Sequence, residues 1–306
     1  MKKTVIVIFG PTGVGKSKTG VELAKLLNGE IISCDSMQVF SDMNIGTAKI
    51  TIEEMQGVPH HLLNVVSPKE EFSVGAYVKL ANQKIEEIFE RGKQPIIVGG
   101  TGLYINALAR GYDFGNTEKD EEIRNKYKQI LEEKGNTFLY EILKNKDENV
   151  AKKIHENDTK KIIRALEILE NKKNNENIEK NNKKIENKYN YLIFGLNLPR
   201  EEMYENINNR AKKMFEEGLV SEVKNLLKSG LTLENQSMQG IGYKEVVSGL
   251  SENKTEQEIL ELIQRKTRNY AKRQLTFMRG IKELVWVDAK NSVKQILEVL
   301  SEQQNN

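Results

Sequence analysis

The feature that most constrains this chain is a glycine-rich loop near its start. The segment GPTGVGKS, residues 10–17, matches the P-loop pattern G-x-x-x-x-G-K-[ST] in full. It follows the apolar run TVIVIF at residues 4–9, which is typical of a buried parallel strand. It opens a segment with helical spacing of apolar residues that stops at Gly29. A strand, a glycine loop and a helix in this order predict a phosphate-binding site.

Each residue type in the loop has a physical reason to be there. The glycines let backbone N–H groups converge on phosphate oxygens, and the start of the helix adds partial positive charge. Lys16 is expected to neutralise phosphate charge, and Ser17 to hold Mg²⁺ through its hydroxyl. Thr12 is either a turn former or a further phosphate donor. The residues expected to bind a diphosphate or nucleotide are Gly10, Pro11, Thr12, Gly13, Val14, Gly15, Lys16 and Ser17.

Strand patterns recur along the chain and alternate with helical ones. Further apolar runs stand at residues 30–35, 94–100, 191–198 and 283–289. Helical spacing is present at residues 75–91, 201–217, 219–229, 236–249 and 256–279. Alternation of this kind predicts an α/β fold, a P-loop NTPase-like parallel sheet with helices on both faces.

The segment 114–189 has a different pattern, with three helical stretches and no strand signal. We therefore expect an α-helical insertion domain, carried by an α/β core formed from residues 1–113 and 190–306. The insertion ends in residues 171–188, where sixteen of eighteen residues are Asn, Lys or Glu. Such a composition buries too little apolar surface to order itself, which predicts a mobile loop.

Composition excludes several classes of protein. The chain has 306 residues, 38% of them hydrophobic, and no apolar run approaches the roughly 20 residues of a membrane span, so no membrane partner is expected. Its single cysteine, Cys34, allows no internal disulfide and suits a reducing cytoplasm. The three histidines lack the spacing of zinc ligands. A formal charge of +3 says little about nucleic acid, for which a local patch matters more.

The loop does not by itself select a reaction. A switch GTPase needs an Asn/Thr-Lys-x-Asp motif after a strand, and none is suitably placed; a kinase usually has an acid after a strand, whereas the third predicted strand ends in VGGTGLY. Asp35 follows the second strand, at the edge where open α/β sheets bind ligands. Two interpretations stay open at this point. Asp35 caps the following helix start, or it deprotonates a nucleophile that attacks a phosphate-bearing carbon.

A basic segment near the carboxyl end suggests a nucleic-acid partner. Residues 265–279 contain six cations and no acid, and Arg265, Arg268 and Lys272 share one helix face. This face either meets RNA phosphates or is a solvated face of a helix that packs inward through Ala271, Leu275 and Met278. The sequence alone leaves both interpretations open.

Eight motifs occur in the order found in one enzyme family. They are GPTGVGKS, DSMQVF (35–40), GTAK (46–49), VPHHLLN (58–64), VGGTGLYI (98–105), IHENDTKKIIRALE (154–167), GIGYKE (240–245) and TRNYAKRQLTFMR (267–279). Together they make residues 4–288 resemble the tRNA dimethylallyltransferases. No carboxy-terminal zinc finger of the eukaryotic type is present, so the resemblance is to the bacterial type.

The resemblance implies transfer of a dimethylallyl group from dimethylallyl diphosphate to N6 of adenosine 37, in the anticodon stem-loop of tRNAs that read UNN codons. It implies assistance by Mg²⁺, a cytoplasmic location and action as a monomer. Asp35 would be the general base, Arg210 would reach the diphosphate, and Thr101 would lie near the reacting groups. The implied tRNA-binding residues are Asp35, Ser36, Met37, Gln38, Thr101, Arg124, Lys160, Lys161, Arg164, Met238, Gln239, Gly240, Ile241, Gly242, Tyr243, Arg265, Arg268, Lys272 and Arg273.

This chain departs from the family pattern at a few positions, and other functions compete. Phe40 stands where the family usually has tyrosine, and Asn206 replaces a frequent arginine. The alternatives are a P-loop small-molecule kinase, an adenylate isopentenyltransferase and a pure RNA-binding module. A free nucleotide needs no large cationic surface, and an RNA-binding module needs no complete P-loop. Both facts favour the tRNA-modifying class.

Overall fold

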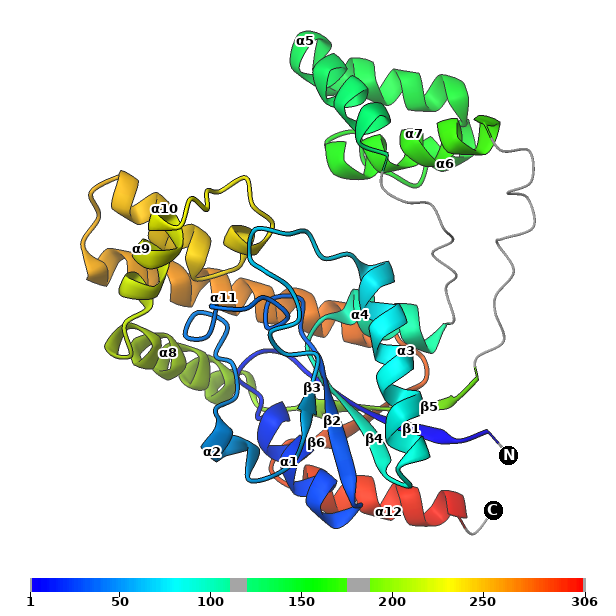
Figure 1. Ribbon diagram of the computed structural model, residues 1–306, viewed down its shortest axis with the longest axis vertical. Helices are drawn as coiled ribbons and strands as arrows, with labels where there is room; N and C mark the ends of the chain where they lie inside the picture. The colour runs from blue at the N-terminus through cyan, green and yellow to red at the C-terminus, as the bar shows by residue number, and fades with distance from the viewer. Residues whose placement is uncertain (1, 111–119, 175–187, 305–306) are drawn as a thin grey trace. The chain divides into compact units, whose positions relative to one another are not determined.

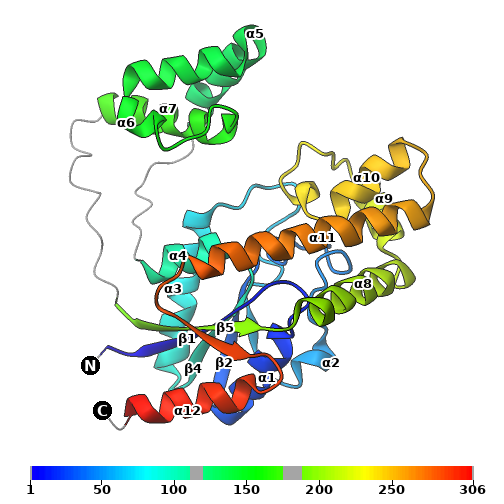
Figure 2. The same ribbon diagram turned by 180° about the vertical axis from the view of Figure 1, so that it is seen from behind.

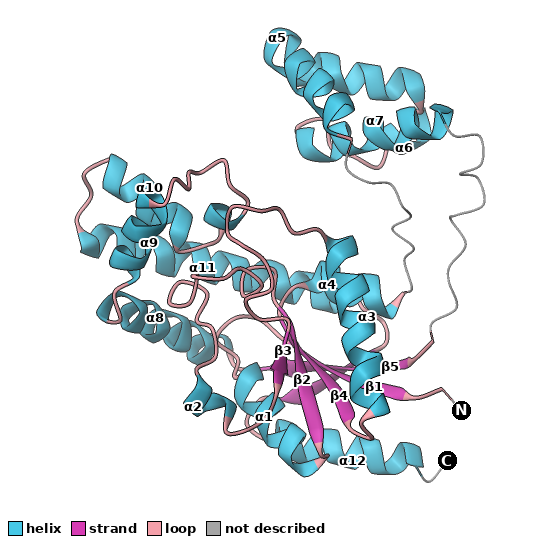
Figure 3. Ribbon diagram, in the orientation of Figure 1, coloured by secondary structure: helices cyan, strands magenta, loops and turns pink. Residues whose placement is uncertain are grey.

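The computed structural model describes residues 2–110, 120–174 and 188–304. The chain forms two compact units, Met1–Arg110 with Asn187–Asn306, and Gly111–Glu186. The first unit contains a six-stranded sheet in the order β3-β2-β4-β1-β5-β6, and every pair of neighbours is parallel (Figures 1 and 3). The predicted α/β class is therefore confirmed. The predicted domain boundaries at 113/114 and 189/190 stay predictions.

The predicted strands are present, and one short strand was not foreseen. The strands are β1 (Thr4–Phe9), β2 (Gly29–Cys34), β3 (His60–His61), β4 (Gln94–Gly99), β5 (Asn190–Asn197) and β6 (Leu284–Asp288). β3 pairs with β2 over two residues, which is too short for a pattern in the sequence to reveal it.

Both faces of the sheet are covered, which explains why its strands are apolar throughout. Along β1, Val5, Val7 and Phe9 join a core that includes α3 (Val74–Glu90). Ile6 and Ile8 point to the opposite face, where α1 (Lys16–Leu26) and α12 (Ser292–Gln304) cover the sheet (Figure 2). A strand buried on both faces loses the alternation of polar and apolar residues.

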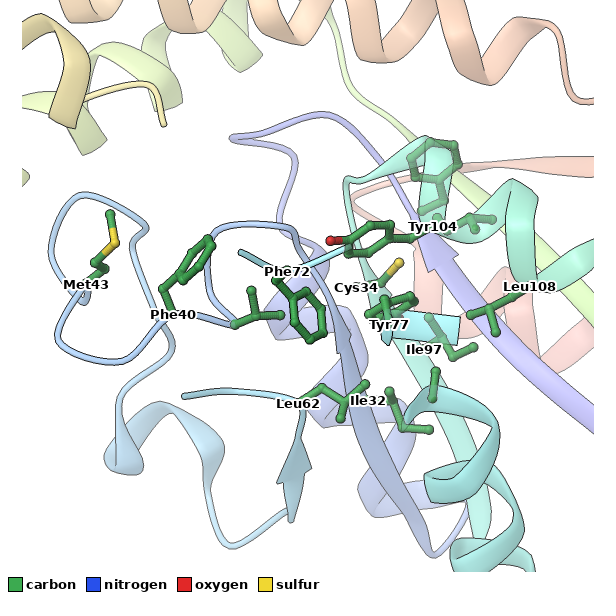
Figure 4. Packing of buried hydrophobic residues seen from close by; sticks show 14 of the residues in the cluster. Ile32, Cys34, Phe40, Met43, Leu62, Phe72, Tyr77, Ile97, Tyr104 and Leu108 are labelled. Atoms are coloured by element: carbon green, nitrogen blue, oxygen red, sulfur yellow. The ribbon is translucent and has the colours of Figure 1, made fainter. Parts of the chain in front are cut away.

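Cys34 ends β2 inside the core on the α3 side. Figure 4 shows its side chain beside Tyr77 and Ile97. The thiol is fully buried, and burial raises its pKa to about 12. A thiol with this pKa carries almost no thiolate at neutral pH, so Cys34 is a core residue and no nucleophile.

Four α-helices of the first unit lie between β5 and β6. They are α8 (Arg200–Glu216), α9 (Leu219–Lys228), α10 (Tyr243–Ser251) and α11 (Glu256–Arg279). The predicted single helix at 236–249 is wrong, because a 3-10 turn at Ser237–Gln239 is separated from α10 by Gly242 at φ 100°. A left-handed backbone there suits glycine and ends helical continuity. Neither the two shorter helices α2 (Ile52–Met55) and α4 (Gly102–Ala109) nor the longer α12 was predicted.

The second unit consists of helices in the part that is described. These are α5 (Glu121–Lys146), α6 (Glu148–Ala151) and α7 (Thr159–Asn174). Gly135, at φ 79° and ψ 173°, interrupts α5, so that α5 corresponds to two of the predicted helices. Tyr127, Leu139 and Leu166 belong to a separate buried core. Of the predicted mobile loop at 171–188, the first four residues belong to α7, and 175–187 lie outside the described residues.

Candidate active site

Three loops meet at the carboxyl edge of the parallel sheet. β1 leads into the P-loop, β2 into Asp35 and β4 into Thr101. The last two loops are bonded to each other: the Thr101 N–H donates to Cys34 O at 3.2 Å, and the Ser36 N–H donates to Thr101 Oγ1 at 3.0 Å. Parallel strands bring such loops together because all their carboxyl ends lie at one edge. The fold therefore assembles the predicted phosphate loop, carboxylate and threonine in one place.

The P-loop has the backbone that its glycines permit. Gly13 and Gly15 adopt φ of 83° and 94°, a left-handed conformation that other residues reach only with strain. The Lys16 ammonium donates to Pro11 O at 2.8 Å. Burial and the nearby Arg210 lower the pKa of Lys16 to about 8, although Asp35 opposes this shift. Ser17 is exposed in the first turn of α1, so its hydroxyl can reach a ligand.

Arg210 reaches the P-loop from α8. One guanidinium nitrogen donates to Thr12 Oγ1 and another to Thr47 O, each at 3.3 Å. Burial lowers the pKa of Arg210, and the Asp35 carboxylate works in the opposite direction. One turn earlier, Asn206 donates through Nδ2 to Gly13 O at 3.0 Å. The structure thus brings the predicted Arg210 to the cradle, and Asn206 contacts the loop despite replacing an arginine.

The helix-capping interpretation of Asp35 is wrong, because residues 36–39 form a turn and the next helix, α2, begins only at Ile52; the acid–base interpretation stays a prediction. Its Oδ1 accepts the backbone N–H groups of Met37 at 2.8 Å and Gln38 at 3.3 Å, which holds the turn that follows β2. Among the described residues, none donates a hydrogen bond to Oδ2. The carboxylate is close enough to raise the pKa values of Lys16 and Arg210. One oxygen therefore orders the loop, and the other is free for acid–base chemistry beside two cations.

The segment after Asp35 lies against another predicted RNA-binding segment. Gln38 accepts from Ser33 Oγ at 3.2 Å and donates to Thr47 O at 3.3 Å, so its amide orientation is fixed. A Cβ on Gly240 would come within 2.5 Å of Met37 Cε, which places residues 238–243 beside residues 35–38. The structure brings these two predicted segments together, although they are far apart in sequence.

Glu222 on α9 holds the loop that follows this segment, and sequence reasoning missed it. Its carboxylate accepts the backbone N–H groups of Asn44 and Ile45 at 2.9 Å and of Gly46 at 3.1 Å. It also accepts the Tyr243 hydroxyl at 2.6 Å. The buried ring of Tyr243, a predicted RNA contact, thus supports this loop. Nothing in the helical pattern of the sequence distinguishes Glu222 from the other glutamates in these helices.

Lys49 and Gln274 were also missed, although both lie in the quoted motifs. The ammonium of Lys49 donates to Phe40 O at 2.7 Å and Asn64 Oδ1 at 2.5 Å, and burial lowers its pKa to about 8. Gln274, on the buried face of α11, bonds to both the P-loop and the loop after β4. Their place in the family motifs was the only signal in the sequence, and a motif does not show which atoms a side chain bonds to.

The basic segment 265–279 lies in α11 and has a buried and an exposed face, as the spacing of its residues predicts. Ala271 and Met278 are completely buried and Leu275 packs against the core, so the predicted inward face is confirmed. Arg265, Lys272 and Arg273 are exposed, whereas the half-buried Arg268 donates to Asn208 Oδ1 at 2.6 Å. Arg265, Lys272 and Arg273 therefore form an exposed cationic face of α11, the helix that also carries Gln274.

The remaining predicted RNA-binding residues lie in the second unit, on α5 and α7. Arg124 and Arg164 both pair with the fully buried carboxylate of Glu167, at 2.9 and 2.7 Å. Lys161 is exposed and pairs with Asp158 at 2.5 Å, and Lys160 is exposed. The two arginines therefore also stabilise the second unit, because Glu167 would otherwise be a buried charge without a partner.

No metal cluster is present among the residues that the structure describes, where no three His, Cys, Asp or Glu side chains gather. The half-buried His60 hydrogen-bonds Val58 O at 2.8 Å, and the half-buried His61 hydrogen-bonds Glu30 at 2.7 Å. None of the described helices is long and apolar enough to cross a membrane.

The fold and the site define a P-loop enzyme that acts on a phosphate-bearing substrate, with a carboxylate and two cations at its cradle. A sequence profile described as IPP transferase matches residues 38–281. The chain is 46% identical to a tRNA dimethylallyltransferase of Carboxydothermus hydrogenoformans, covering 97% of this chain and 96% of the relative. The chain belongs to the IPP transferase family.

Two solved structures extend this likeness to three dimensions. A tRNA isopentenylpyrophosphate transferase from Bacillus halodurans is 41% identical with a TM-score of 0.73, covering 99% of this chain and 96% of that one. A eukaryotic dimethylallyltransferase acting on tRNA is 33% identical with a TM-score of 0.81, covering 98% of this chain and 79% of that one. The resemblance inferred from the motifs is confirmed.

Proposed function

We propose that this enzyme transfers a dimethylallyl group from dimethylallyl diphosphate to N6 of adenosine 37 in the anticodon loop of tRNAs that read UNN codons. The products are N6-(dimethylallyl)adenosine and diphosphate. The observation that carries the proposal is the convergence of Lys16, Arg210 and Asp35 at one edge of the sheet. The P-loop then holds the diphosphate of an isoprenoid, and the carboxylate faces an amine instead of a metal ion.

The proposed reaction is a displacement at the first carbon of the dimethylallyl group. N6 attacks this carbon, the carbon–oxygen bond to the diphosphate breaks, and Asp35 takes the proton that N6 loses. A base matters because the lone pair of N6 is delocalised into the purine ring. Negative charge grows on the leaving diphosphate, and Lys16 and Arg210 are placed to stabilise it. Thr101 fixes the loop after Asp35 through its bond to Ser36.

Mg²⁺ fits the donors that the cradle offers. Ser17 would supply one hydroxyl ligand, and phosphate oxygens and waters would supply the others, which is the usual way in which Mg²⁺ binds beside phosphates. The ion would neutralise part of the diphosphate charge.

The tRNA is proposed to bind across several elements. A stacked adenosine in an anticodon loop cannot enter a site, so the base must be pulled out of its stack. Residues 35–38 would read the everted adenine, and the cations of α11 would meet stem phosphates. Arg124, Lys160, Lys161 and Arg164 would supply further contacts from the second unit. One copy of the chain supplies every proposed group, and the reaction would take place in the cytoplasm, where tRNA is found.

The proposal is tested by mixing the purified full chain with unmodified tRNA and labelled dimethylallyl diphosphate. Label is expected in RNA at adenosine 37, in a reaction that needs Mg²⁺. Label on free AMP but not on tRNA would indicate an adenylate isopentenyltransferase. ATP turnover without RNA would indicate a kinase, and either outcome would overturn the proposal.

A further inference from the structure

Gln274 is a buried amide that joins two loops of the active site. It lies on the inner face of α11 with 7% of its surface exposed. Its Oε1 accepts the backbone N–H of Thr12 in the P-loop at 3.0 Å. Its Nε2 donates to the carbonyl of Gly100, next to Thr101, at 2.8 Å. A single side chain from α11 therefore bridges the P-loop and the loop after β4.

Packing around the bridge is close. A Cβ on Gly100 would come within 2.4 Å of Gln274 Nε2, so a side chain at position 100 would displace the amide. A Cβ on Gly102 would come within 2.4 Å of the Phe277 ring, one turn further along α11. The pairing of β1 with β4 ends at Phe9 and Gly99, so beyond that point the Gln274 amide links the two loops to each other and to α11.

Both ends of the bridge lead directly to groups with proposed roles. The hydroxyl of Thr12 accepts a hydrogen bond from Arg210, to which the proposed function assigns the leaving diphosphate. Thr101, next to Gly100, accepts the N–H of Ser36 and so holds the turn that begins at Asp35. A shift of Gln274 would thus change the distance between the diphosphate cradle and the carboxylate.

We propose that Gln274 is a positioning residue that fixes the diphosphate cradle relative to the Asp35–Thr101 loops. The inference rests on the proposed function, because it takes the roles of Arg210 and Asp35 from there. A displacement needs its nucleophile, base and leaving group at set distances, and a misplacement of about 1 Å can cost roughly 10²-fold in rate. The competing explanation is that Gln274 only satisfies two buried polar groups and stabilises the fold.

The first test replaces the amide by an apolar side chain of similar length, Gln274→Met, in the full chain. We expect kcat for labelled dimethylallyl transfer to fall roughly 10- to 10²-fold, while KM for either substrate changes by less than about threefold. Gln264→Met is the matched control. Gln264 lies on the same helix and donates to a backbone carbonyl, that of Asn208, at 3.3 Å, but among the described residues it makes no hydrogen bond to either loop. Circular dichroism establishes that each variant is folded.

A second variant separates positioning from stability and does not depend on the first. In Gln274→Glu, a neutral carboxyl group can both accept from Thr12 and donate to Gly100, whereas a carboxylate can only accept. The ratio of variant to wild-type kcat should therefore rise as the pH falls through the pKa of the new carboxyl group. The same ratio for Gln264→Glu should stay flat.

The outcomes distinguish this inference from the proposed function. Unchanged kcat in folded Gln274→Met, or a ratio for Gln274→Glu that does not change with pH, would overturn the positioning role while leaving the transfer reaction intact. Absence of transfer by the wild-type chain would instead overturn the proposed function.

Discussion

Replacing Asp35 by asparagine separates the two roles of this side chain. The Oδ1 of asparagine can still accept the N–H groups of Met37 and Gln38, at 2.8 and 3.3 Å in the wild type, so the turn should be kept. An amide nitrogen replaces Oδ2 and cannot take a proton. We expect the free energy of unfolding to change by less than about 1 kcal/mol and kcat to fall by about 10²- to 10⁴-fold.

Asp35→Asn should lower the rate of transfer without weakening the binding of dimethylallyl diphosphate. Asp35 raises the pKa of Lys16, which is about 8 in the wild type, and that pKa should fall further when the carboxylate is removed. At pH 6 Lys16 stays mainly charged in both proteins. There, loss of a negative charge near the diphosphate should leave KM for dimethylallyl diphosphate unchanged or lower it. The loss of activity should therefore appear in kcat alone.

Single-turnover transfer with excess enzyme, labelled dimethylallyl diphosphate and an unmodified anticodon stem-loop measures the chemical step directly. Asp35→Ala provides a comparison, because it removes the two turn hydrogen bonds as well as the base and should also cost about 1 kcal/mol of stability. Transfer by Asp35→Asn at the wild-type rate would remove Asp35 from the chemistry. A rise in KM with unchanged kcat would assign Asp35 to binding only.

Three further predictions concern charge. Affinity for inorganic diphosphate should weaken as the pH rises through about 8, where Lys16 loses its proton, and calorimetry on Lys16→Arg should show no such decline. Burial alone would raise the pKa of Glu30, but hydrogen bonds from Arg91, His61 and Lys93 lower it to about 2. Glu30 therefore stabilises the fold above pH 4.5, the pKa of this carboxyl group in the unfolded chain, and this stabilisation is lost as the pH falls toward 2. In urea unfolding, Glu30→Gln should lower the free energy of unfolding by up to about 3 kcal/mol at pH 7 and by little at pH 2. If Arg265 and Lys272 contact tRNA phosphates, replacing either by alanine should reduce the slope of log affinity against log salt by about one, whereas an unchanged slope would place that cation outside the interface.

The sequence by itself determined the phosphate loop, the parallel sheet and the position of Asp35 at its edge. These follow from local rules: glycine at left-handed positions, apolar runs of strand length and helical spacing after them. The same rules placed the exposed cations and the buried residues of α11 on opposite faces. They failed at residues 236–249, where apolar spacing continues through Gly242 although the backbone does not.

Only the tertiary structure decided which side chains hold the site together. Gln274 bonds to Thr12 across 262 residues, and Glu222 bonds to Asn44 across 178. The structure also showed that Asp35 caps no helix: its Oδ1 holds the turn of residues 36–39, and no described residue donates to its Oδ2. A hydrogen bond depends on distances and angles between two atoms, and for residues so far apart in the chain only the packed fold sets them.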